Sequence, residues 1–119
     1  SLAGLATRCP MLKELCIEQC VGVTDVTMVP LAERCTLLTT LHMDGVPGIT
    51  CATLLQIAKT CTFFQTLNAK DCRGIRTAGV AAILDHCPRI GFINTSDSYG
   101  VDKGELRGHN KNPSHICVW

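Results

Sequence analysis

Hydrophobic residues recur along this chain with a fixed period of 26 residues. One position of each period holds a leucine or isoleucine, at Leu15, Leu41, Leu67 and Ile93. Five further columns keep the same step through four periods without an insertion. They are the cysteines Cys9, Cys35, Cys61 and Cys87, the glycines Gly22, Gly48, Gly74 and Gly100, and the hydrophobic columns that begin at Leu5, Leu12 and Val23. A fixed period of this length is typical of a protein built from stacked structural units.

The order of polar and hydrophobic positions predicts one strand and one helix in each period. Residues 14–18 alternate between polar and hydrophobic side chains, which indicates a strand with one buried face. Met28, Leu31 and Ala32 follow at helical spacing, so a helix there would turn its apolar side toward the strand. The predicted fold is an α/β solenoid, curved, with parallel strands on the concave face and helices on the convex face.

Local signals predict how each unit turns from strand to helix. Gly22 falls in the turn, where a residue free of restrictions on φ is useful. Thr24 or Asp25 is placed to cap the helix that follows. Pro30 lies inside that helix and is predicted to kink or shorten it, because proline lacks the backbone N–H.

The period also predicts the division of the chain. Residues 1–106 are interpreted as 26-residue repeats, of which the first is truncated because Leu2 aligns with Met28 in the middle of a helix. Residues 107–119 lack the period and form a C-terminal tail or cap. An open end of stacked repeats needs a polar cap, and none is visible near residue 1. We therefore expect a piece of a longer repeat protein or one subunit of a larger complex.

One unit carries a motif with a known counterpart. Leu12, Leu15, Ile17 and Cys20 stand at the positions of an L-x-x-L-x-L-x-x-N/C pattern. The chain thus resembles the cysteine-containing class of leucine-rich repeats, as in F-box proteins with leucine-rich repeats. The resemblance implies a protein-protein interaction module that selects substrates for a cullin-type ubiquitin ligase. No F-box is present, and the alternative is a structural scaffold subunit of a large assembly of ciliary or ribosomal type.

Composition removes several other classes of partner. The formal net charge is +1, so no basic excess favours nucleic acid. No apolar run approaches the length of a membrane span. The nine cysteines stand mostly in periodic positions, which favours buried, reduced thiols over disulfides and indicates a cytoplasmic or other reducing intracellular compartment. We expect no cofactor and no metal, because the tail residues His109, His115 and Cys117 lack a known ligand spacing.

Catalytic chemistry has little support in the sequence. A Gly-rich phosphate loop, a G-x-S-x-G motif and an H-E-x-x-H motif are all absent. Cys16, His42 and Asp44 fall close together on the predicted concave face and would form a Cys-His-Asp set. An open face provides no pocket that excludes water. The chain is therefore predicted not to be an enzyme.

The predicted concave face is the candidate binding surface, because such repeats usually hold protein partners there. Acidic residues gather at its N-terminal side, which would suit a basic segment of a partner. Phe92 is predicted to be exposed and to serve as an apolar anchor at the other side. The candidate partner-binding residues are Glu14, Glu18, His42, Asp44, Asn68, Lys70 and Phe92.

Overall fold

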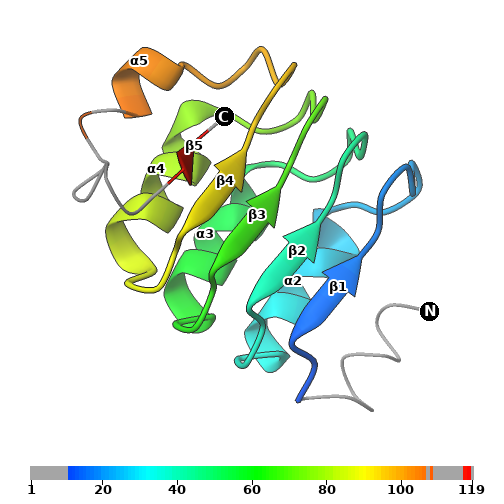
Figure 1. The fold of residues 1–119 in the computed structure, drawn as a ribbon. Coiled ribbons are helices and arrows are strands. Elements are labelled where there is room, and N and C mark those ends of the chain that lie inside the picture. Colours follow the sequence, from blue (N-terminus) through cyan, green and yellow to red (C-terminus); the bar gives the residue numbers. More distant parts are fainter. Residues whose placement is uncertain (1–10, 107, 109–116, 119) are drawn as a thin grey trace.

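Parallel strands alternate with helices along the whole described chain (Figure 1). The computed structural model describes residues 11–106, residue 108 and residues 117–118. Each of the first four strands has three residues, and three of the helices have ten. The elements are β1 (Glu14–Cys16), α2 (Asp25–Arg34), β2 (Thr40–His42), α3 (Cys51–Thr60), β3 (Thr66–Asn68), α4 (Thr77–His86), β4 (Phe92–Asn94), α5 (Lys103–Leu106) and β5 (Cys117–Val118).

The strands form one parallel sheet in the order of the sequence. Leu15 pairs with Leu41, Leu41 with Leu67, and Leu67 with Ile93, so the register equals the sequence period. The prediction of parallel strands alternating with helices is confirmed. Strand β5 was not expected, and its Cys117 pairs with Phe92 at a step of 25 residues instead of 26.

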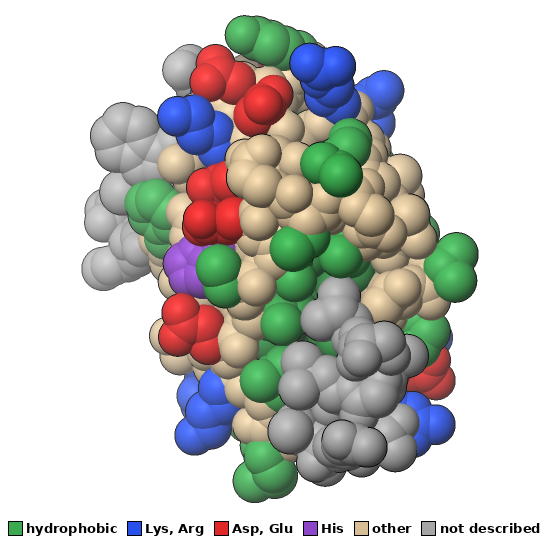
Figure 2. All heavy atoms as spheres, turned by 90° about the vertical axis from the view of Figure 1, so that its right-hand side faces the viewer, with side chains coloured by type: hydrophobic (Ala, Val, Ile, Leu, Met, Phe, Trp, Pro, Cys, Tyr) green, Lys and Arg blue, Asp and Glu red, His purple; other side chains and the backbone are tan. Residues whose placement is uncertain are grey.

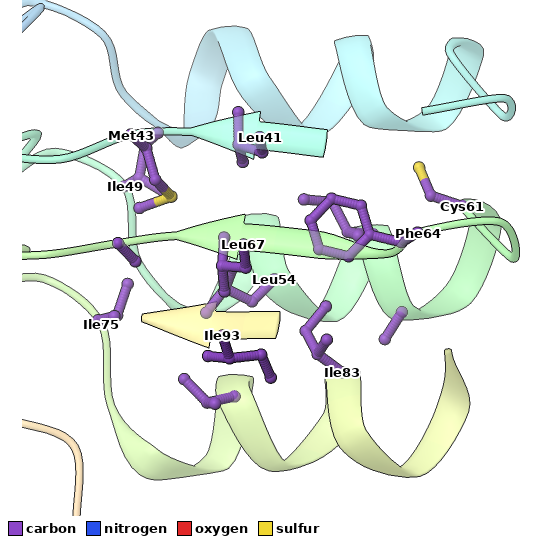
Figure 3. Packing of buried hydrophobic residues seen from close by; sticks show 14 of the residues in the cluster. Leu41, Met43, Ile49, Leu54, Cys61, Phe64, Leu67, Ile75, Ile83 and Ile93 are labelled. Carbon is purple, nitrogen blue, oxygen red and sulfur yellow. The ribbon is translucent and has the colours of Figure 1, made fainter. Parts of the chain in front are cut away.

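Helices α2, α3 and α4 cover one face of this sheet, and the buried side chains lie between the two layers (Figure 1). Leu41, Leu67 and Ile93 follow one another on successive strands and point toward the helices, as Figure 3 shows. Phe64 and Ile83 fill the space near the ends of helices α3 and α4 and are fully buried. Burial of each such side chain contributes roughly 1.5–3 kcal/mol, so this single layer is the main source of stability.

In each turn, the residue with a left-handed backbone conformation is not the glycine of the periodic column. Positive φ angles occur instead at Gln19 (61°), Gly45 (73°), Asp71 (53°) and Asp97 (61°), which also lie 26 residues apart. Three of the four are not glycine, although a non-glycine residue in this region costs about 1 kcal/mol. The prediction that Gly22 and its equivalents supply freedom in φ is therefore wrong.

The glycine column is explained by close packing between consecutive units. A Cβ atom on Gly48 would lie 2.6 Å from the carbonyl oxygen of Val23, and one on Gly74 would lie 2.5 Å from that of Ile49. Gly100 would meet the carbonyl oxygen of Ile75 at 2.5 Å. These contacts involve backbone atoms, which cannot swing away as a side chain can, so only glycine fits.

Replacement of Gly74 by alanine tests this explanation. We expect Gly74→Ala to lower the free energy of unfolding by about 1–3 kcal/mol, because the backbone must move to admit a methyl group. The measurement is urea unfolding followed by far-ultraviolet circular dichroism. Gly22→Ala is the matched control, since a Cβ atom there meets nothing within 4 Å. Equal effects of the two substitutions would contradict the explanation.

Helix α2 departs from its prediction in two ways. Pro30 does not shorten it, since α2 has ten residues like α3 and α4. Pro30 is exposed, so water can solvate the backbone carbonyl that loses its partner, and the buried Met28 and Leu31 hold the helix in place. Thr24 occupies the N-cap position but makes no side-chain capping hydrogen bond.

Asp25 joins helix α2 to the next unit instead of capping its own helix. Its Oδ1 accepts hydrogen bonds from Thr50 N at 3.0 Å and Thr53 Oγ1 at 2.6 Å, and its Oδ2 accepts one from Thr50 Oγ1 at 2.6 Å. Partial burial acts to raise the pKa of Asp25, but the hydrogen bonds from Thr50 and Thr53 hold this pKa below its ordinary value. The ionised carboxylate therefore stabilises the junction of α2 with α3.

We expect Asp25→Asn to lower the free energy of unfolding at neutral pH by roughly 1 kcal/mol, because a charged acceptor is lost from a partly exposed site. A lowered pKa means that the native state favours the ionised form. The stabilisation is therefore present above the ordinary pKa of 3.8 and is lost as the pH falls through the folded-state value. Urea unfolding of both proteins between neutral and acidic pH checks this; a difference that is independent of pH would contradict it.

Candidate protein-binding face

The uncovered sheet face presents the side chains that alternate with the core residues. Every central strand residue, such as Leu41 and Leu67, is buried beneath the helices, and its two neighbours on the strand are exposed or partly exposed. The register aligns Cys16 with His42, His42 with Asn68, and Asn68 with Asn94. The sheet therefore arranges the predicted binding residues in columns across the strands.

Three of the predicted residues form a chain of hydrogen bonds across strands β1, β2 and β3. Asn68 Nδ2 lies 2.9 Å from His42 Nδ1, and His42 Nε2 lies 3.2 Å from Glu14 Oε1. Because an amide nitrogen can only donate, Nδ1 accepts, and the ring proton on Nε2 is donated to the carboxylate. The imidazole orientation is thereby fixed on both sides. The exposed fraction of the Glu14 side chain is 67%, so this pair contributes at most about 1 kcal/mol to stability.

Asp44 and Lys70 are neighbours just beyond the ends of strands β2 and β3. Asp44 Oδ1 accepts a hydrogen bond from the backbone N of Lys70 at 2.8 Å, while the side chain of Lys70 extends from an exposed position. Glu18 is exposed at the equivalent position of the first unit. Acidic groups thus lie at the β1 side of the face and a lysine lies farther along it, as the sequence predicted.

Figure 2 views the molecule from the β1 end. Acidic side chains and a histidine lie along the left margin of this view, with Lys or Arg side chains above and below them, and hydrophobic side chains gather in the middle. Glu14 and Glu18 are exposed at this end of the sheet. Electrostatic attraction at this end would favour a positively charged partner segment.

Phe92 differs from its prediction. It is only partly exposed, and strand β5 pairs beside it through Cys117. A side chain in this position has less free surface to offer a partner than an open edge would provide. Phe92 is therefore partly exposed instead of fully exposed, and its role as an apolar anchor stays a prediction.

The structure does not place Cys16, His42 and Asp44 in a catalytic arrangement. Cys16 is exposed and lies beside His42 in the sheet register, but both imidazole nitrogens are engaged with Glu14 and Asn68. A nucleophilic cysteine needs a neighbouring base in hydrogen-bond reach. His42 is here occupied as a link between strands.

The periodic cysteines act as buried hydrogen-bond donors. Cys61 Sγ lies 3.5 Å from the carbonyl oxygens of both Ala32 and Cys35, and Cys72 Sγ lies 3.0 Å from that of Met43. Cys35 and Cys87 are buried as well, as the period predicted, whereas Cys9 lies outside the described residues. Each of these contacts joins one unit to the preceding unit.

Burial also makes these thiols hard to ionise. It raises the pKa of Cys61 to about 11 and that of Cys87 to about 12, and it raises the pKa of Cys72. The thiolate is the reactive form of cysteine. The buried column is therefore built for packing, whereas Cys16 and Cys20 are exposed.

Metal ligation and membrane insertion find no support in the part of the chain that the structure describes. No group of three or more His, Cys, Asp or Glu side chains is placed there to hold a metal ion. His109 and His115 lie outside the described residues. Within the same part, none of the helices has both the length and the apolar character needed to cross a bilayer.

The sequence reasoning missed a row of residues in the turns before the strands. Met11, Leu37, Phe63 and Arg89 occupy equivalent positions there, and we call them the turn row. The row keeps the 26-residue step, so it could have been found as a seventh column. The hydrophobicity of its residues does not distinguish an exposed column from a core column, and Met11 is 69% exposed.

Comparison with known proteins shows the fold and not a family. No model of a known protein family matches the chain, and no curated protein matches it. Among solved structures, the chain is similar to "Leiomodin-1 Actin-Binding Site 2 (ABS2)", with a TM-score of 0.73 and 15% identity. The match covers 98% of this chain and 75% of that one. At this identity the likeness supports the α/β architecture alone.

Thiol labelling tests the division between buried and exposed cysteines. With iodoacetamide at mildly alkaline pH, we expect rapid labelling of Cys16 and Cys20 and strong protection of Cys61 and Cys87 until urea unfolds the chain. Since the folded-state pKa of the buried thiols is raised, their contribution to stability is present below the ordinary value of 9.0 and is lost as the pH rises through the raised values. Peptide mass spectrometry reads each site. Equal labelling of all four in the native protein would contradict this division.

Proposed function

We propose that this chain is a protein-recognition module built from cysteine-containing leucine-rich repeats, which stack as a curved solenoid. The single observation that carries the proposal is the uncovered sheet face, on which Glu14, His42 and Asn68 are held in fixed positions across three strands. The strand residues that face away from the helices are exposed or partly exposed across β1 to β4, and such a broad face suits a protein surface better than a small molecule.

The composition of the face supports a basic partner segment. Glu14 and Glu18 are exposed at the β1 end. Asp44, which is the equivalent of Glu18 in the next unit, is partly exposed. His42 and Asn68 keep polar groups within reach of a partner while already holding each other in place, which lowers the entropy lost on binding. Lys70 stands one unit beyond Asp44 in the same column. It would repel a partner segment whose positive charges extend past the acidic residues.

The resemblance to F-box proteins with leucine-rich repeats suggests what the recognition serves. In that interpretation the module selects substrates for a cullin-type ubiquitin ligase in a reducing intracellular compartment. The alternative is a scaffold subunit within a large assembly. The similar solved structure is, by its name, an actin-binding site of leiomodin-1. A protein-binding role thus has a precedent on this architecture, and actin is one partner to include in a test.

Affinity purification of the protein from the cells that make it, followed by mass spectrometry, tests these two interpretations. A cullin and its adaptor in near-equal amounts would support the ligase, whereas many subunits of one assembly without a cullin would favour the scaffold. We expect Glu14→Lys with Glu18→Lys to lower recovery of the specific partner about tenfold, because both substitutions reverse the charge at the β1 end.

The matched control is Glu33→Lys, which reverses an exposed charge on helix α2 at the covered side of the sheet. It should leave recovery unchanged, and far-ultraviolet circular dichroism should be the same for all variants. Unchanged recovery with the Glu14 and Glu18 pair, or equal loss with Glu33→Lys, would show that the sheet face is not the binding surface.

A further inference from the structure

The turn row forms a second surface, separate from the sheet face. Met11, Leu37 and Phe63 lie in the turns that precede strands β1, β2 and β3, and they line a hollow of about 390 Å³. Met11 is 69% exposed and Phe63 is 37% exposed, although both side chains are large and apolar. Apolar groups gathered at one exposed hollow mark an interaction site more often than isolated ones do.

Positive charge borders the same hollow. Lys13 lines it at the β1 side, and Arg89 lines it at the other side with its guanidinium 4.7 Å from the centre of the Phe63 ring. The remaining described residues of the lining are Thr39 and Gln65, which are neutral. Among the described residues, the hollow therefore combines an apolar floor with two cations and no carboxylate.

The stacking of Arg89 on Phe63 prepares this surface for an anion. A guanidinium that lies over a ring keeps its N–H groups free to meet a carboxylate with two hydrogen bonds. The aromatic contact also limits the positions of the long arginine side chain, so less entropy is lost when a carboxylate binds. Phe63 meanwhile retains exposed ring surface for an apolar group.

From this charge complementarity we infer that the turn row binds a segment of a partner protein in which aspartate or glutamate alternates with large apolar side chains. The apolar side chains of that segment enter the hollow over Met11, Leu37 and Phe63, and its carboxylates meet Lys13 and Arg89. The sheet face is acidic at its β1 end, so the two surfaces differ in charge. This inference does not depend on the proposed function of the sheet face.

Selection from a random peptide library displayed on phage tests the inference with the whole chain as bait. The expected result is enrichment of peptides that combine aspartate or glutamate with leucine or phenylalanine. Fluorescence anisotropy should then show binding about tenfold weaker to Arg89→Glu and to Phe63→Ala than to the unaltered protein, because each removes one half of the site. Lys13→Glu should weaken binding in the same direction.

Arg73→Glu is the matched control, because it reverses an exposed charge that lines a different hollow. It should leave peptide affinity unchanged, because Arg73 is not among the residues that line the turn-row hollow. Circular dichroism establishes that each variant is folded. Enrichment of basic peptides, absence of enrichment, or equal loss with Arg73→Glu would overturn the inference. So would sedimentation that shows a dimer dissociated by Phe63→Ala, because a second copy of this chain would then occupy the row.

Discussion

Main-chain hydrogen bonds between consecutive units extend well beyond the three residues of each strand. Thr39 N donates to Lys13 O before the strands begin, and Gln19 N donates to Asp44 O after they end. The same contacts recur one period later, at Gln65 N and Gly45 N. A strand of three residues is too short to be stable by itself. Each unit therefore depends for its conformation on the main-chain hydrogen bonds that join it to its neighbours. The same hydrogen bonds set the register and so align the side chains in columns.

Side chains at the junctions donate hydrogen bonds to carbonyl oxygens that the main-chain hydrogen bonds between units do not use. Buried carbonyl oxygens without a partner cost free energy, and small donors at the junctions satisfy them. Cys72 Sγ donates to Met43 O, and one unit later Ser98 Oγ donates to Ala69 O at 2.6 Å. A thiol and a hydroxyl thus have the same role at equivalent positions. Packing and hydrogen bonding therefore explain the buried cysteines Cys35, Cys61, Cys72 and Cys87.

The sequence period is sufficient to predict the parallel register, the core column of Leu41 and Leu67, and the arrangement of His42 beside Asn68. It cannot predict features that depend on contacts between units. The glycine column follows from a distance to a neighbouring carbonyl group, which no single unit contains. Strand β5 departs from the period by one residue, so the period alone does not predict that a strand pairs beside Phe92. The turn row keeps the period, but hydrophobicity alone does not distinguish a core position from an exposed one.

The register has a consequence for how such a gene can change. Helices α2 and α4 each pack chiefly on α3, and each strand pairs only with the strands next to it. Gain or loss of a whole 26-residue unit would leave every type of junction as it was. Deletion of one residue, in contrast, would turn the following strand over and bring its polar side chains into the core. Mutations that alter length should therefore survive selection in whole periods, and the number of units can vary faster than the length of any one of them.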